Sequence, residues 1–125
     1  MATTQRPLSP HLQVYRLPLT AMISITHRMT GAVLAMGLLA MPLILLMISS
    51  GPSAYGLLQS LISSTIGTLV LIAWSYALFF HLCHGIRHLF WDFGKGFEHD
   101  QLHRIALIEM ALSVLITALV WLVAA

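Results

Sequence analysis

The stretch GAVLAMGLLAMPLILLMI, Gly31–Ile48, contains no charged and no hydrogen-bonding side chain. Together with the more polar residues that precede it from Ala21, it exceeds the roughly 20 residues that cross the hydrocarbon core of a bilayer. Pro42 lies inside the stretch, and a membrane helix can tolerate a proline there. The stretch therefore predicts a transmembrane helix, which we place at about 20–49.

The composition of the whole chain agrees with a membrane protein. Of its 125 residues, 58% are hydrophobic and 8% are charged, whereas a soluble domain is about 25% charged. This length allows one compact unit and leaves no room for a soluble catalytic domain. The single cysteine, Cys83, excludes an internal disulfide and an iron–sulfur cluster held by this chain alone. The net charge of +2 comes from cations that flank apolar runs, which favours a topology signal over binding of nucleic acid.

Two further apolar runs follow, Leu61–Phe90 and Ile105–Ala125. They predict helices at about 61–91 and 103–125. Gly51 and Pro52 end the first helix, and an uncharged loop leads from it to the second. We therefore expect an N-terminal segment, residues 1–19, and a transmembrane domain, residues 20–125. The predicted fold class is all-α, a bundle of three transmembrane helices.

The arginines and lysine predict the orientation of the bundle. They precede the first span or bracket the second loop, and the first loop and the C-terminus have none: Arg6, Arg16, Arg28, Arg87, Lys95 and Arg104. Because positive residues stay on the cytoplasmic side, we expect a cytoplasmic N-terminus and a periplasmic C-terminus in a bacterial inner membrane. The mitochondrial inner membrane is the second choice.

Three histidines and an arginine end the second run, in HLCHGIRHLFWDFG, His81–Gly94. At 100° per residue, His81, His84 and His88 share one helix face, and Arg87 lies on a largely different one. His81 would lie about 15 Å below the membrane surface, near the middle of the bilayer. An ionisable side chain at that depth is costly and usually functional. A neutral imidazole is a common axial ligand of haem iron, but the spacing also allows a structural bridge, a proton relay, or a zinc or copper site.

The first span carries a second polar group, SITHR, Ser24–Arg28. Ser24 and Arg28 share one face, with His27 beside them. Arg28 could pair with a haem propionate, or polarise a quinone carbonyl together with the Ser24 hydroxyl. From the residues alone, the preferred explanation is an arginine that marks the membrane surface and a serine that caps the helix.

Two stretches resemble a known family. RPLSPHLQVYRLPLTAMISITHRMTG, Arg6–Gly31, resembles the N-terminal signature of the cytochrome b membrane-anchor subunits of succinate dehydrogenase (respiratory complex II). HLCHGIRHLFWDFG resembles that family's second signature, His-x-x-x-Gly-Ile-Arg-His followed by an aspartate. The two stretches cover about a third of the chain, and they stand in the family's order among three spans.

The resemblance implies a haem site. His81 would be the axial ligand of haem b, and the other ligand would come from a second membrane-anchor subunit. His27 and His88 would lie near the haem propionates. Nothing carries over to His84, because the family motif leaves its position open.

The resemblance also implies a ubiquinone site with Ser24 and Arg28, and a polar cluster at the membrane surface that includes Asp92. An iron–sulfur subunit and a flavoprotein subunit would complete the enzyme, and no catalytic activity is expected from this chain alone. One alternative is the haem b anchor of a related fumarate reductase. The other is a haem-free membrane anchor or a metal-binding protein.

Three helices cannot enclose a haem, so a second three-helix subunit is expected to close the pocket. Small residues let helices approach closely in a membrane. We therefore expect that interface at Gly31, Ala32, Ala35, Gly37 and Gly85.

Overall fold

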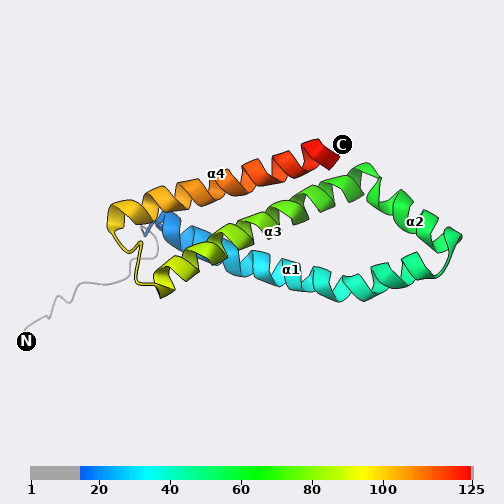
Figure 1. The fold of residues 1–125 in the computed structure, drawn as a ribbon, viewed down its shortest axis with the longest axis horizontal. Coiled ribbons are helices and arrows are strands. Elements are labelled where there is room, and N and C mark those ends of the chain that lie inside the picture. Colours follow the sequence, from blue (N-terminus) through cyan, green and yellow to red (C-terminus); the bar gives the residue numbers. More distant parts are fainter. Residues whose placement is uncertain (1–14, 125) are drawn as a thin grey trace, which may run out of the picture.

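The computed structural model describes residues 15–124, which form four α-helices. They are α1 (Leu19–Ser49), α2 (Pro52–Ile62), α3 (Thr65–Asp92) and α4 (His99–Ala124). Figure 1 shows the three long helices running along one another, α3 antiparallel to α1 and α4, with the short α2 joining α1 to α3 at one end. Each long helix contains a segment long and apolar enough to cross a membrane. The predicted all-α bundle with three transmembrane helices is confirmed, whereas most of the expected N-terminal segment 1–19 lies outside the described residues.

A small core joins the three long helices near the end where α1 begins and α3 ends. Ile23 of α1, Phe80 of α3 and Ala106 of α4 are buried there and pack together. Most other large apolar side chains point outward, including Leu39 at 81% exposure and Val123 at 88%. In a bilayer such side chains face lipid or a partner subunit, and this core is one of the contacts that join the three helices.

The structure differs from the prediction between the first two spans. Instead of a loop over 49–60, residues Pro52–Ile62 form α2, and the second span begins at Thr65 rather than near 61. Gly51 supplies the turn with φ at 105°, and Pro52 begins the helix where its missing N–H costs nothing. Ser64 then caps α3, its hydroxyl accepting from the Gly67 amide at 3.1 Å.

The turn between α3 and α4 is made by two glycines. Gly94 and Gly96 adopt φ of 71° and 83°, a conformation that other residues rarely adopt. The Trp91 indole N–H donates to the Gly96 carbonyl at 3.3 Å and closes the turn. α4 begins at His99, a turn earlier than expected.

Two of the small residues expected at a partner interface are occupied within this chain instead. A Cβ on Gly31 would lie 2.9 Å from Cε1 of His81, and a Cβ on Gly37 would overlap the Trp74 indole. Both glycines therefore let α3 side chains lie directly on the α1 backbone. A Cβ on Gly85 would meet no neighbouring helix within 4 Å among the described residues, so this glycine is open to a partner.

We expect Gly37→Ala to destabilise the packing of α1 on α3, because the added methyl would overlap the Trp74 indole, which lies directly on the Gly37 backbone. Overpacking of this kind typically costs about 1–3 kcal/mol. The measurement is the thermal midpoint of the detergent-solubilised complex. Gly56→Ala in α2 is the matched control, since its Cβ would meet no described side chain, and an equal midpoint for both variants would contradict the packing role of Gly37.

Candidate functional site

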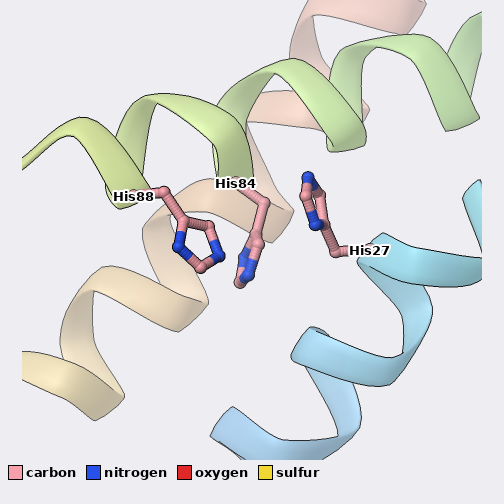
Figure 2. A group of neighbouring side chains, drawn as sticks. All are labelled: His27, His84 and His88. Carbon is pink, nitrogen blue, oxygen red and sulfur yellow. The ribbon is translucent and has the colours of Figure 1, made fainter. Parts of the chain in front are cut away.

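Four histidines from two helices gather where the three long helices converge. The His27 ring, on α1, stacks on the His81 ring with centroids 4.0 Å apart and planes 14° apart. It lies 4.5 Å from the His84 ring and 5.7 Å from the His88 ring. Figure 2 shows His27 facing His84 and His88 across the space between α1 and α3. The structure thus brings together the three residues predicted for the haem site, which are His27, His81 and His88. His84, which had no predicted role, lies in the same cluster.

The surroundings of His81 fix which of its ring nitrogens is free. Its Nδ1 lies 3.1 Å from the carbonyl oxygen of His27 and 3.2 Å from Oγ1 of Thr30. A carbonyl oxygen can only accept, so Nδ1 carries the proton, and the lone pair of the neutral ring belongs to Nε2. A hydrogen bond to one imidazole nitrogen is how proteins orient the other toward a metal.

Gly31 determines how closely this ring approaches α1. The His81 Cε1 atom lies where the Cβ of any other residue would be crowded. Thr30, the preceding residue, donates its hydroxyl to the same His27 carbonyl at 2.8 Å. His27, Thr30 and Gly31 of α1 therefore form the surface on which the His81 ring packs. His81 is half-buried, so part of its side chain is exposed.

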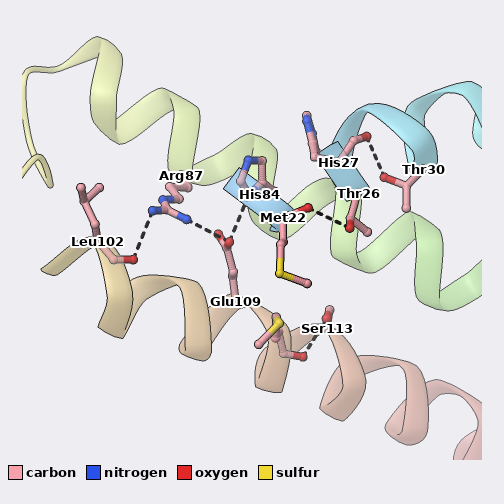
Figure 3. Close-up of polar contacts among 10 residues, drawn as sticks. Met22, Thr26, His27, Thr30, His84, Arg87, Leu102, Glu109 and Ser113 are labelled. Carbon is pink, nitrogen blue, oxygen red and sulfur yellow. Dashed lines mark hydrogen bonds and ion pairs between the residues drawn. The ribbon is translucent and has the colours of Figure 1, made fainter. Parts of the chain in front are cut away.

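A buried ion pair joins α3 to α4 behind the histidines (Figure 3). Oε1 of Glu109 accepts from Nη1 of Arg87 and from Nδ1 of His84, each at 3.0 Å. The exposed fractions are 1% for His84, 3% for Arg87 and 4% for Glu109. Arg87 also donates to the Leu102 carbonyl at 3.2 Å and lies 4.6 Å from the centre of the Trp91 ring.

Several buried polar atoms at this junction have no hydrogen-bond partner within the described part of the chain. They are Nε2 of His27, Nε2 of His84, Nε of Arg87 and Oε2 of Glu109. Buried groups of this kind normally find protein, water or a ligand. Their clustering makes the junction of α1, α3 and α4 a candidate site for ordered water or a ligand.

Glu109 and Thr30 had no predicted role, and Arg87 was expected to act only as one of the cations that set the topology. A signal existed for Glu109, because it is the single acid inside the last apolar run and such a residue needs a partner. Arg87 does lie on another face than His81, but that face packs on α4, so its charge does not reach the membrane surface. No pattern in the sequence identified Thr30.

The predicted quinone residues lie near the same end of the bundle. Ser24 is half-buried and Arg28 exposed, one turn apart on α1 and on either side of His27. Asp92 is the last residue of α3 and is exposed. None of these three side chains makes a hydrogen bond or ion pair to another described residue, so all three remain available to partners.

The comparisons with known proteins agree with one another. A family model described as succinate dehydrogenase/fumarate reductase transmembrane subunit matches residues 2–120. The chain is 41% identical over 114 residues to the succinate dehydrogenase cytochrome b556 subunit of Paracoccus denitrificans, covering 91% of this chain and 88% of that one. It is 36% identical over 117 residues to the mitochondrial cytochrome b560 subunit of Bos taurus, covering 90% and 68%. The chain belongs to this family.

Membership of the succinate dehydrogenase/fumarate reductase transmembrane-subunit family gives the chain a general role. It is a multi-pass membrane protein that serves as a membrane-anchor subunit of an enzyme complex. The resemblance stated from the two sequence signatures is thereby confirmed.

We expect Glu109→Leu to destabilise the chain, because Arg87 would stay buried without a counter-charge. Breaking a buried pair in this way typically costs about 3–5 kcal/mol. Glu109→Leu combined with Arg87→Met removes both charges and should recover most of the loss. The thermal midpoint of the solubilised complex measures both effects, and a double variant as unstable as the single one would refute the pairing.

Proposed function

We propose that this chain anchors a succinate:quinone oxidoreductase, binds haem b together with a second anchor subunit, and forms part of the ubiquinone-reduction site. The observation that carries the proposal is the geometry of His81. Its Nδ1 proton is engaged by the His27 carbonyl, so Nε2 is left with a lone pair for iron. The relatives' own names, cytochrome b556 and b560, support a haem in this family.

The residues around His81 fit a haem. A half-buried neutral imidazole suits an axial ligand, and a second imidazole would come from the partner subunit. The buried, unpartnered Nε2 of His27 and the exposed ring of His88 suit the propionates. An apolar groove of about 450 Å³ between α1 and α3, lined by Leu34 and Leu78 among others, starts one turn from Gly31 and His81 and offers apolar surface to a porphyrin.

A bound haem b would supply a one-electron carrier, whose potential responds to burial and to nearby charges. In the proposal, the chain's own residues do three things. His81 would hold the haem iron, and Thr30 with the His27 carbonyl orients its ring so that Nε2 carries the lone pair. Gly31 lets the ring lie against α1.

The quinone would be held by Ser24 and Arg28, whose side chains are unpaired within the described residues. The Ser24 hydroxyl would donate to one quinone oxygen. Arg28 would stabilise the negative charge that develops on the quinone as electrons arrive from the iron–sulfur subunit, as a preorganised donor does in an oxyanion hole. Asp92, exposed at the end of α3, would belong to the polar cluster at the same surface.

The charges of the bundle support the predicted orientation. Arg16, Arg28, Lys95 and Arg104 are all exposed and lie toward the end where α1 begins and α3 ends. We propose that this end faces the cytoplasm of a bacterium and that the iron–sulfur and flavoprotein subunits dock there. The family description covers fumarate reductases too, but the relatives named above are succinate dehydrogenases, which favours electron flow from succinate to quinone.

We expect His81→Ala to abolish the b-type band in the reduced-minus-oxidised spectrum of the purified complex, because the axial ligand is lost. Gly31→Ala should weaken or remove the same band, since the new methyl displaces the ring.

The control is His84→Asn, which keeps an amide N–H that can donate to Glu109 and leaves His81 untouched. An unchanged band in His81→Ala would reject the ligand assignment. Loss of the band in His84→Asn as well would show that the region tolerates no change, and would remove the support for a specific ligand.

We expect Ser24→Ala and Arg28→Leu to reduce succinate–quinone activity about tenfold or more each, the effect of losing a hydrogen bond to a charged group. Succinate oxidation with an artificial acceptor should be unchanged, because it does not use the quinone site. Thr26→Ala and Arg104→Leu are matched controls, an exposed hydroxyl on α1 and an exposed arginine on α4. A parallel fall of both activities would mean that Ser24 and Arg28 are structural.

A further inference from the structure

We propose that His27, His84 and His88 form a binding site for one divalent transition-metal ion of the zinc class. The proposed haem site gives no role to His84, and yet His84 is among the most completely buried side chains of the chain. The metal site explains that residue, so the inference goes beyond the proposed function.

The three imidazoles are close enough to share an ion. Each offers one ring nitrogen, and these nitrogens lie within 4.8 Å of one another. A tetrahedral zinc ion with bonds of roughly 2.0–2.1 Å holds its nitrogen ligands about 3.4 Å apart. The rings must therefore close by at most about 1.4 Å, a distance that side-chain rotation can supply. Figure 2 shows the rings of His84 and His88 directed toward the space that His27 faces.

Two of the three ligands present a buried nitrogen that lacks a partner. Nε2 of His27 and Nε2 of His84 have no hydrogen bond within the described part of the chain. A neutral ring nitrogen buried without a partner costs free energy, which a bound ion would remove. His88 is exposed, so it leaves a route by which the ion and a fourth ligand, such as water, can reach the site.

The protonation of His84 suits a metal ligand. Its Nδ1 lies 3.0 Å from Oε1 of Glu109, the same oxygen that accepts from Nη1 of Arg87. Nδ1 therefore carries the proton and Nε2 the lone pair. A histidine that donates its other N–H to a carboxylate is the usual arrangement around protein-bound zinc, where the carboxylate orients the ring and raises its basicity.

The donor set indicates which ions the site would take. Neutral imidazoles suit zinc, copper, nickel and cobalt, whereas magnesium and calcium prefer oxygen. Cys83 is not part of the cluster and lines a groove between α3 and α4 together with Glu109. Because His27 and His88 are also proposed to serve the haem propionates, metal and haem should compete for these two residues.

The experiment is a titration of the intact detergent-solubilised complex with Co²⁺, whose absorption reports tetrahedral coordination, followed by displacement with Zn²⁺. The complex is prepared from haem-replete cells and from haem-deficient cells, after removal of bound metal by a chelator. We expect one Co²⁺ per copy of this chain, bound more tightly without haem. His84→Asn should weaken binding more than about 100-fold, and Glu109→Gln by about 10–100-fold, the loss typical of an outer-shell change.

His103→Asn is the control, since this histidine of α4 is exposed and lies outside the cluster. Equal affinity in His84→Asn and the unchanged complex, in either preparation, would overturn the proposal. So would the same loss in His103→Asn, which would reveal only scattered surface histidines.

The haem spectrum of the same samples keeps the two proposals apart. Equal metal affinity with and without haem, still dependent on His84, would support the metal site and reject His27 and His88 as propionate contacts. A complex with no b-type band that still binds Co²⁺ through His84 would refute the haem proposal alone.

Discussion

The carboxylate of Glu109 is buried between α3 and α4, and it positions the side chains of Arg87 and His84. A charge at this depth can persist only with partners, because lipid supplies no hydrogen bonds. Arg87 neutralises the carboxylate, and His84 donates to the same oxygen. The pair therefore sets the register of α4 on α3, and it also determines which nitrogen of His84 faces α1.

The packing of α1 depends on a different device. Here the contact is made by glycines, which let the rings of His81 and Trp74 lie on the α1 backbone. Because the His81 ring packs this closely, its Nδ1 reaches the His27 carbonyl, and this hydrogen bond determines the tautomer of the ring. The apolar core of Ile23, Phe80 and Ala106 packs at the same end of the bundle. Polar and apolar contacts therefore stabilise the same junction of the three helices.

The sequence predicted the spans well because hydropathy over about 20 residues reports directly on the bilayer. It also grouped His81, His84 and His88 correctly, since helical periodicity is local. It could not predict α2, because an uncharged stretch that starts with Gly51-Pro52 fits a loop as well as a short helix. Nor could it pair Arg87 with Glu109, which lie on different helices and meet only through the turn at Gly94 and Gly96. Gly31 and Gly37 were expected at a partner interface for the same reason: a small residue permits close approach but does not say to what.

The geometry of α3 explains how one helix can serve two neighbours. Steps of three residues turn a helix by about 60° in the same sense, so His84 stands midway between His81 and Arg87. His81 meets α1, Arg87 meets α4, and His84 touches the His27 ring on one side and Glu109 on the other. On the α4 side, Arg87 and Glu109 are both buried, whereas His81 packs on α1 and is only half-buried. Under the two proposals, a haem held by His81 would be completed by a partner subunit, whereas a metal ion held by His84 would lie largely within this chain.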